Sequence, residues 1–512
     1  MKKNNIKKFW WFMSGIVHHP ELLSMLLLLL VSVTAYAYDF ESNGLKYHIL
    51  SEEDRTVEVA NNEWISGDIE IPRNLVYNSR TYTVTSIGDN AFSSCIDMTS
   101  VIIPNSVTSI GKSAFAYCYK LASVTIPNSV SSIGEDAFFK CTSLTSVTIP
   151  NSIKFIEKNM FWECFSLTSI TIPNSVIFID KWAFYSCSSL TSVTIPNSVV
   201  SINTEAFMNC SSLTSITIPN SVTDLSYDAF HGCSSLANIL VDSENTRYTS
   251  INGILYNKDV TTLEYCPEAK FSVTIPNTVT SISKSAFHNC NRLKSVTIPN
   301  STTYIADGAF AGCSSLASVI ISDSVTYIGN SAFYGCSSLP SVTIPNSVTY
   351  IGYEAFLGCS NLTSVTIPNS VNRMGRCVFS HCEKIANVYV HTLIPVESLC
   401  CFDDKVLLLA QLYVPTGTLA NYKTVAPWKY FRNIEEMDFS DVDGITNDSD
   451  EELRVSVNYG ILIIDGVGVN ECVTVYDMQG RVVYNGTSHT VDNLSPSLYI
   501  VKAGDKTAKI SI

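Results

Sequence analysis

A cysteine recurs every 23 residues along most of this chain, and no other feature constrains the fold as strongly. The spacing holds on both sides of one interruption and defines a column of Cys95, Cys118, Cys141, Cys164, Cys187, Cys210, Cys233, Cys290, Cys313, Cys336, Cys359 and Cys382. A fixed period of this length is typical of solenoids, in which each repeat forms one rung and needs its neighbours to bury its apolar side chains. The chain is therefore predicted to stack rungs into an elongated array.

Within one repeat, the apolar residues follow a pattern typical of two short strands. Val193 and Ile195 alternate with polar residues, so their side chains share one face of a strand. Residues 196–198 then provide a Pro-Asn-Ser turn, and residues 199–202 a second extended segment. Residues 204–209 suit a single helical or 3₁₀ turn. The predicted rung is strand, turn, strand and short helical turn.

Two recurring motifs carry a resemblance to a known family. The sequence S-V-T-I-P-N-S-V stands at Ser192–Val199 and again at Ser341–Val348, and A-F-x-x-C follows it, as at Ala332–Cys336. These motifs resemble the BspA-type leucine-rich repeats of bacterial surface proteins. The resemblance implies an α/β repeat solenoid of 23-residue rungs with mostly short parallel strands over residues 81–390.

The same resemblance implies what interrupts and closes the array. The insertion at about residues 241–274 contains Ile251–Tyr256 and is similar to the hairpin that such arrays often carry. Residues 38–80 resemble an N-terminal cap, and residues 391–437 a C-terminal cap. Caps are also expected on physical grounds, because an uncovered end rung exposes strand edges and apolar side chains.

The first residues are typical of an export signal. Four lysines (Lys2, Lys3, Lys7 and Lys8) precede an apolar run at residues 22–33 and the small-x-small site Ala35–Ala37. Residues 1–37 are therefore predicted to be a cleaved signal peptide. A retained membrane anchor is the alternative, since residues 9–17 are also apolar, but residues 18–21 interrupt that run and the rest is short for a span.

Residues 438–452 are rich in Asp and Glu and poor in apolar residues, so they are predicted to form a solvated acidic linker. Their acidic side chains raise the question of a calcium loop. The fifth position of that loop would be Ile445, which fails the EF-hand pattern. No metal is expected there.

The tail, residues 453–512, changes to short alternating segments typical of a small C-terminal β-sandwich. Val475–Val483 and Leu498–Val501 resemble motifs of the C-terminal sorting domain of type IX secretion. That resemblance implies contact with the outer-membrane secretion machinery and attachment to the bacterial surface, usually with removal of the tail. The alternative is a β-domain with no sorting role.

Stacked rungs keep the side chains of the cysteine column parallel, about 4.8 Å apart, which is wider than the Cβ separation of about 3.8 Å that a disulfide prefers. The column is therefore predicted to consist of buried small hydrophobic residues. Better candidates for oxidation are Cys266, Cys377, Cys400, Cys401 and Cys472. Zinc binding by Cys377, His381, Cys382, Cys400 and Cys401 is an alternative that matches no common ligand spacing.

Motifs of catalysis are missing from the sequence. It contains no G-x-S-x-G, H-E-x-x-H or G-x-x-x-x-G-K-[ST] after residue 37, so we expect no enzyme activity, catalytic residue, metal or cofactor. His231 and His288 stand two residues before a column cysteine, where other repeats carry Ala, Tyr, Trp or Leu, and are predicted to lie at the surface. The net charge of −14 and the lack of a basic stripe argue against a nucleic-acid partner.

Specificity is expected in the columns that vary between repeats, because the core positions repeat for packing reasons. Aromatic residues gather in two stretches of these columns: Phe155, Trp162, Phe178, Trp182 and Tyr185 in one, and Tyr304, Tyr327 and Tyr350 in the other. Exposed aromatic side chains are enriched in interaction hot spots, so both sets are predicted to bind a partner. The alternative is side-by-side packing between rungs.

These observations favour a secreted, non-catalytic, monomeric protein on the bacterial surface that mediates adhesion or protein–protein interaction. Its expected partners are extracellular proteins or glycans, including host matrix. An envelope scaffold or glycan-binding surface protein is the second hypothesis. A third, ice binding, follows from the Ser-x-Thr pairs on successive strands, such as Ser146 and Thr148, but a leucine-rich array curves and ice needs a flat plane.

Overall fold

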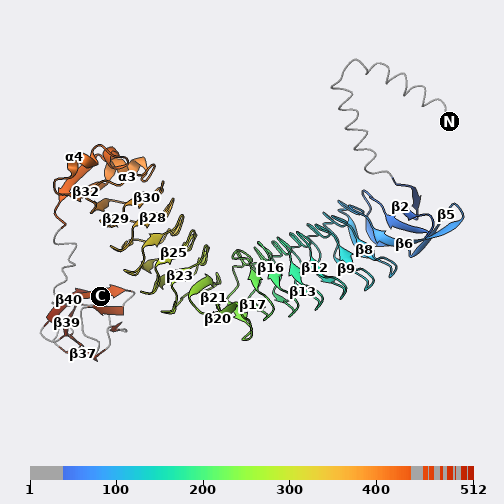
Figure 1. The fold of residues 1–512 in the computed structure, drawn as a ribbon, viewed down its shortest axis with the longest axis horizontal. Helices are drawn as coiled ribbons and strands as arrows, with labels where there is room; N and C mark the ends of the chain where they lie inside the picture. The colour runs from blue at the N-terminus through green and yellow to red at the C-terminus, as the bar shows by residue number, and fades with distance from the viewer. Residues whose placement is uncertain are drawn as a thin grey trace, which may run out of the picture. The chain divides into compact units, whose positions relative to one another are not determined.

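The computed structural model describes residues 38–439 and, in the tail, residues 454–458, 461–465, 473–476, 481–487, 490–491, 498–503 and 506–511 (Figure 1). The chain divides into two compact units, Met1–Asp438 and Phe439–Ile512. The expected signal peptide, nearly all of the expected linker and Cys472 lie outside the described residues. Within them, no helix is long and apolar enough to cross a membrane.

Most repeats of the first unit contribute short strands to two rows. The first row is β7 (Met98–Ile102), β9 (Ser123–Thr125), β11 (Ser146–Thr148), β13 (Ser169–Thr171), β15 (Ser192–Thr194), β17 (Ser215–Ile218), β19 (Asn238–Val241), β24 (Ser295–Thr297), β26 (Ser318–Ile320), β29 (Ser364–Ile367) and β31 (Asn387–Val390). The second row is β8 (Ser109–Ile110), β10 (Ser132–Ile133), β12 (Phe155–Ile156), β14 (Phe178–Ile179), β16 (Ser201–Ile202), β18 (Asp224–Leu225), β23 (Ser281–Ile282), β25 (Tyr304–Ile305), β27 (Tyr327–Ile328), β28 (Tyr350–Ile351) and β30 (Arg373–Met374).

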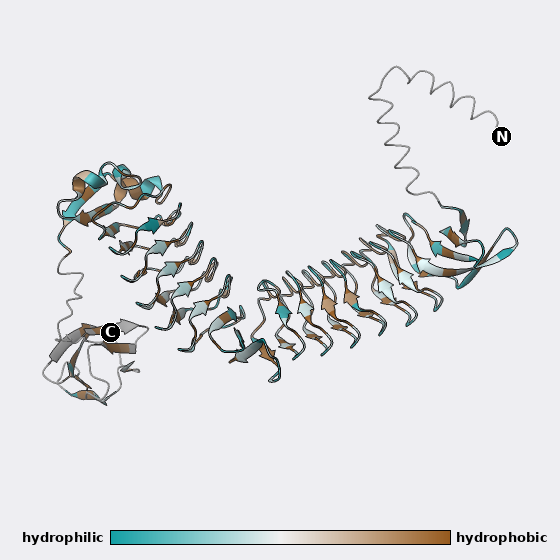
Figure 2. Ribbon diagram, viewed as in Figure 1, coloured by the Kyte–Doolittle hydropathy of each residue, from teal (hydrophilic) through white to brown (hydrophobic). Residues whose placement is uncertain are grey.

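Neighbouring rungs pair in parallel and in register. In β9 and β11, for example, Ser123 lies opposite Ser146 and Val124 opposite Val147, so partners are one repeat apart. Val147 is buried while Ser146 and Thr148 face solvent, as expected from the alternation of side chains along a strand. Hydrophobic and hydrophilic segments accordingly alternate within each rung (Figure 2). The predicted solenoid of 23-residue rungs with parallel strands is confirmed.

The expected helical turn at the end of each rung is wrong. Residues 204–209 form consecutive turns, because Glu205 and Asn209 have left-handed backbones with φ of 53° and 62°. Backbone N–H groups alternate between partners: that of Ala206 donates to Asn203 in its own rung (3.2 Å), and that of Phe207 to Ala229 in the next rung (2.9 Å). Bonds between rungs thus take the donors that a helix would use.

A ladder of phenylalanines and cysteines fills the interior of the array. The Phe184 ring stacks on that of Phe207 in the next rung at 5.1 Å, and the ladder repeats this contact on both sides of the insertion. The Cys187 Sγ donates a hydrogen bond to the Phe161 carbonyl at 3.2 Å. Cysteine suits this column because it combines a small apolar side chain with a weak donor.

The N-terminal segment of the first unit is a set of strands that joins the second row. It comprises β1 (Phe40–Ser42), β2 (Leu45–Ser51), β3 (Thr56–Val59), β4 (Gly67–Glu70), β5 (Asn74–Tyr77) and β6 (Arg80–Ile87). Strand β6 pairs in parallel with β8, while β4 pairs with β7 of the first row. Both rows are therefore continued beyond the first repeat.

The insertion forms an antiparallel meander of β20 (Tyr248–Ile251), β21 (Ile254–Asn257) and β22 (Thr262–Tyr265). Strand β22 pairs in parallel with β23, with Thr262 opposite Ser281. The Cys266 carbonyl accepts a bond from Cys290 Sγ at 3.6 Å. The end of the insertion thus takes the place of a preceding rung for the second run of repeats.

The segment after the last repeat, residues 391–437, is here called the closing segment and continues the parallel strand pairing. It consists of α3 (Asp404–Leu409), β32 (Gln411–Pro415), α4 (Leu419–Tyr422), the 3₁₀ helix η1 (Trp428–Tyr430) and β33 (Asn433–Met437). Strands β31, β32 and β33 pair in parallel. Phe402 stacks on Phe379 at 5.6 Å, so the phenylalanine ladder continues one position past the last column cysteine.

The second unit contains two antiparallel sheets in its described residues. One has β34 (Arg454–Asn458), β35 (Ile461–Asp465) and β38 (Thr490–Val491), and the other has β37 (Val482–Gly486), β36 (Val473–Tyr476), β39 (Leu498–Ala503) and β40 (Lys506–Ser511). Both sheets contribute to one buried cluster that includes Leu462, Val475 and Val501. The β-sandwich and its sorting role remain predictions.

Candidate interaction surfaces

The second row of strands positions the variable aromatic column. In most of the two-residue strands the second residue, usually Ile, points into the core, and the first points outward. In-register pairing sets Tyr304 opposite Tyr327, and Tyr327 opposite Tyr350. Outward side chains of successive rungs therefore lie side by side at the strand spacing of about 4.8 Å.

Tyr304, Tyr327 and Tyr350 form a continuous row of stacked rings, which we call the tyrosine row. Ring centroids are 4.6 and 4.7 Å apart, with interplanar angles of 13° and 14°. The Arg373 guanidinium lies over the Tyr350 ring, 5.4 Å from its centroid. Most ring faces are thus covered by the next ring or by Arg373, which leaves edges and hydroxyl groups for solvent.

The middle phenol of the tyrosine row is uncharged at neutral pH. Partial burial, together with the neighbouring Tyr304 and Tyr350 phenols, raises the pKa of Tyr327 to about 12. A neutral phenol both donates and accepts hydrogen bonds. The row therefore presents three adjacent hydroxyl groups on pre-stacked rings, a surface that combines apolar edges with directional polar contacts.

Phe155 and Phe178 occupy the same column in the first run of repeats and are here called the phenylalanine pair. Their rings stack at 5.8 Å, and 45% and 38% of the two residues is exposed. Ser132 and Ser201 are their neighbours in the column. These small residues end the stack on either side, so the pair forms a short apolar patch of two rings.

Trp162, Trp182 and Tyr185 form a separate cluster on the turns, here called the tryptophan cluster. Trp162 stacks on Tyr185 at 4.0 Å and meets Trp182 edge-on at 5.9 Å. All three side chains are half-buried. The Trp182 Nε1 donates to Glu205 Oε2 at 3.1 Å, so part of its polar capacity is already used within the protein.

The tryptophan cluster extends to residues that the sequence reasoning missed. Phe139 stacks on Trp162 at 5.9 Å, and Tyr117 meets Phe139 edge-on at 5.3 Å. Phe139 stands two residues before its column cysteine, as Trp162 and Tyr185 do, and this shared position is the signal that could have identified it. Among the described residues, no ring contact joins this cluster to the phenylalanine pair, so the first predicted set separates into two surfaces.

The insertion and the closing segment each carry a hollow. A cavity of about 380 Å³ at the insertion is lined by Tyr227, Arg247, Tyr248, Lys258 and Glu264, among others. A groove of about 680 Å³ at the closing segment has a more apolar lining that includes Leu399, Cys400, Leu407, Leu408, Pro427 and Tyr430. Neither hollow contains any of the predicted aromatic residues.

The predicted surface location of His231 is wrong. Only 7% of this residue is exposed, and its ring stacks on His288 at 5.0 Å and on Tyr265 of the insertion at 5.7 Å. Burial, and then the neighbouring His288, lower the pKa of His231 to about 4. The insertion covers the column at this point, which a comparison of single repeats does not reveal.

Glu268 lies near this histidine pair and is also buried. Its carboxylate accepts a hydrogen bond from the Gly232 backbone at 2.6 Å. Burial raises the pKa of Glu268 to about 7. Within the part of the chain that the structure describes, no group of three or more His, Cys, Asp or Glu side chains is arranged to hold a metal ion.

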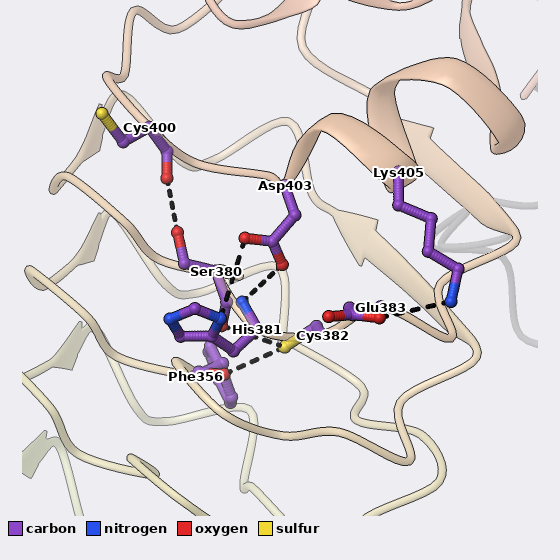
Figure 3. Close-up of polar contacts among 8 residues, drawn as sticks. All are labelled: Phe356, Ser380, His381, Cys382, Glu383, Cys400, Asp403 and Lys405. Carbon is purple, nitrogen blue, oxygen red and sulfur yellow. Dashed lines mark hydrogen bonds and ion pairs between the residues drawn. The ribbon is translucent and has the colours of Figure 1, made fainter.

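The cysteine column consists of buried free thiols, as predicted. Outside the column, Cys266 and Cys401 are also buried, Cys377 is half-buried and Cys400 is exposed. The His381 side chain, proposed as an alternative zinc ligand, instead lies 3.9 Å from Asp403, while the Cys400 sulfur points away from both (Figure 3).

Comparison with known proteins agrees with this architecture. The family model for the BspA type leucine rich repeat region matches residues 74–191, 154–269 and 260–386. A search of the curated proteins found no match.

Solved structures show the same fold. A leucine-rich cell surface protein from Faecalibacterium prausnitzii is 27% identical, with a TM-score of 0.52, over 80% of this chain and 98% of that chain. A leucine-rich repeat protein from Bacteroides ovatus is 27% identical, with a TM-score of 0.54, over 78% of this chain and 100% of that chain. The pneumococcal vaccine antigen PcpA is 20% identical, with a TM-score of 0.51, over 79% of this chain and 98% of that chain. At this identity the similarity shows a shared fold and nothing more. The repeats and their match over more than half of the chain establish that this protein belongs to the BspA-type leucine-rich-repeat family.

Proposed function

We propose that this protein is a secreted module, attached to the bacterial surface, that binds an extracellular protein and performs no catalysis. Family membership supports a binding role, and the similar protein from F. prausnitzii is described as a cell surface protein. The observation that carries the proposal is the tyrosine row, because it combines partly exposed aromatic rings with a line of phenol hydroxyl groups on a rigid frame.

The geometry of the row favours a protein over a glycan. Sugars bind aromatic residues by lying on an open ring face, and here ring faces are covered by neighbouring rings and by Arg373. Ring edges and hydroxyl groups suit contact with peptide groups and side chains. Stacking also holds the rings in place before binding, which lowers the entropy cost of association.

The test replaces Tyr304, Tyr327 and Tyr350 with Ser and measures capture from arrays of extracellular-matrix proteins and of glycans. Removal of hot-spot aromatic residues is expected to weaken protein capture at least tenfold, which corresponds to about 1.4 kcal/mol. The matched control replaces Phe155 and Phe178 with Ser, in the same column of the other run. Unchanged protein capture by the tyrosine variant, with its circular dichroism intact, would contradict the proposal, and hits on glycans alone would favour the glycan-binding alternative.

The sorting role of the tail is a second part of this proposal. Deletion of residues 453–512 is expected to leave the protein in the periplasm, because the repeats carry no motif resembling the sorting domain. The measurement is protease accessibility on intact cells, with the full-length chain as control. Surface display of the truncated chain would contradict the sorting role and leave the binding proposal untouched.

A further inference from the structure

Cys377 and Cys400 occupy equivalent positions in the last repeat and in the closing segment. Both have left-handed backbones, with φ of 56° and 53°. The Cys377 N–H donates to the Leu399 carbonyl at 3.0 Å, and the Phe379 N–H to the Cys401 carbonyl at 3.0 Å. These bonds flank the pair and hold the two turns in register.

The two thiols are neighbours as a result of this register. Adjacent rungs place equivalent Cα atoms about 4.8 Å apart, within the range of about 4.4–6.8 Å found for disulfides. Burial raises the pKa of the Cys377 thiol, and the neighbouring Cys400 thiol raises it further. The register thus places the two thiols side by side.

Access to solvent distinguishes this pair from the cysteine column. The column thiols also have cysteine neighbours, but they are buried. Cys401, next to Cys400 in sequence, is buried as well. Cys377 and Cys400 are the two described thiols that an oxidant in solution can reach.

The surrounding contacts hold the backbone of the closing segment, and none of those drawn in Figure 3 involves the Cys400 sulfur. The Ser380 hydroxyl donates to the Cys400 carbonyl at 2.6 Å, and the His381 N–H donates to Asp403 at 2.6 Å. Lys405 forms an ion pair with Glu383 at 3.2 Å. Cys400 also lines the groove of about 680 Å³ at the closing segment, so its side chain has space for the small adjustment that brings the two Cβ atoms together.

We propose that Cys377 and Cys400 form a disulfide that fastens the closing segment to the last repeat. The step is thiol–disulfide exchange with a small-molecule or protein disulfide. The exposed Cys400 thiolate attacks the oxidant and releases one thiol, and Cys377 then attacks the Cys400 sulfur and releases the second. Two electrons pass to the oxidant, whose two sulfur atoms leave as thiols with the two cysteine protons. The occurrence of this step in the cell rests on the proposed export, because the cytoplasm keeps thiols reduced.

The test uses the full chain purified in reduced form and then equilibrated with oxidised glutathione. Remaining thiols are blocked with N-ethylmaleimide after denaturation, and the protein is digested with trypsin without reductant. Cleavage after Arg376, Lys384 and Lys405 separates the pair onto peptides 377–384 and 385–405. We expect these peptides to be linked, with maleimide on Cys382 and Cys401, and to separate on reduction.

Matched variants make the result specific. Cys400→Ser is expected to abolish the linked peptide, whereas Cys401→Ala is expected to retain it. Full maleimide labelling of both Cys377 and Cys400 after oxidation would overturn the proposal, as would chains joined to one another through Cys400. Because the oxidant is supplied in solution, the outcome does not depend on export; a linked peptide in vitro but reduced thiols in protein from cells would instead count against the proposed location.

Discussion

The two runs of repeats have the same backbone pattern and the same types of core residue, but they present different outward columns. The phenylalanine pair of the first run is a short apolar step ended by serines, whereas the tyrosine row of the second run spans three rungs and is covered at one end by Arg373. Core positions, in contrast, carry the same Phe and Cys in both runs. The difference shows that stacking sets where a side chain lies, while the identity of outward residues is free to specialise.

The prediction with the largest expected effect compares how much one core phenylalanine contributes to stability in each run of repeats. Phe184→Ala in the first run and Phe333→Ala in the second each remove a fully buried ring of the ladder. Each is expected to lower the free energy of unfolding by about 3–5 kcal/mol, because lost burial and a new cavity act together. Denaturant unfolding of the two variants measures this. A large difference between them would break the equivalence of the runs.

The second prediction concerns the end of the first run, where His231 replaces the tyrosine found at Tyr185 and Tyr334. The folded-state pKa of about 4 lies below the ordinary value of 6.5, so the unfolded chain binds the proton more readily. Stability is therefore lost as pH falls from about 6.5 to 4, by about 3 kcal/mol from this group. His231→Tyr should remove that loss, as measured by unfolding at a series of pH values.

Glu268 supplies the control of opposite sign. Its pKa is raised to about 7, so its contribution to stability is present at low pH and is lost as pH rises from the ordinary value of 4.5 through 7. Glu268→Gln should still lose stability as pH falls from about 6.5 to 4, but it should no longer lose stability as pH rises from 4.5 through 7. An acid-side loss that persists in His231→Tyr would show that another group is responsible.

The smallest predicted effect compares the spacing of rungs in the two runs. A Cβ added at Gly352 would lie 2.4 Å from the Asn330 backbone N, whereas the equivalent position in one rung of the first run is Glu157. Gly352→Ala is expected to cost about 1–3 kcal/mol through overpacking, and Glu157→Ala much less. Equal effects in denaturant unfolding would mean that the rungs relax to admit the methyl group.

Much of the fold follows from the spacing of residues along the chain. The 23-residue period, the alternation at Val193 and Ile195, and the buried cysteine column predicted rungs, parallel strands and core, and these are confirmed. The helical turn was wrong because left-handed residues such as Glu205 direct alternate N–H groups to the next rung. The periodicity of the sequence predicts which residues are buried. It does not predict that backbone N–H groups alternate between partners in the same rung and in the next rung.

The candidate surfaces were predictable as columns and not as contacts. The sequence by itself determined that Tyr304, Tyr327 and Tyr350 recur at one position of a stacked repeat. Only the tertiary structure decided that their ring faces are covered, that His231 lies under the insertion, and that Cys377 lies beside Cys400. The physical reason is that a repeat sets the register between like residues, whereas the insertion and the closing segment do not repeat, so what they cover depends on how they fold against the array.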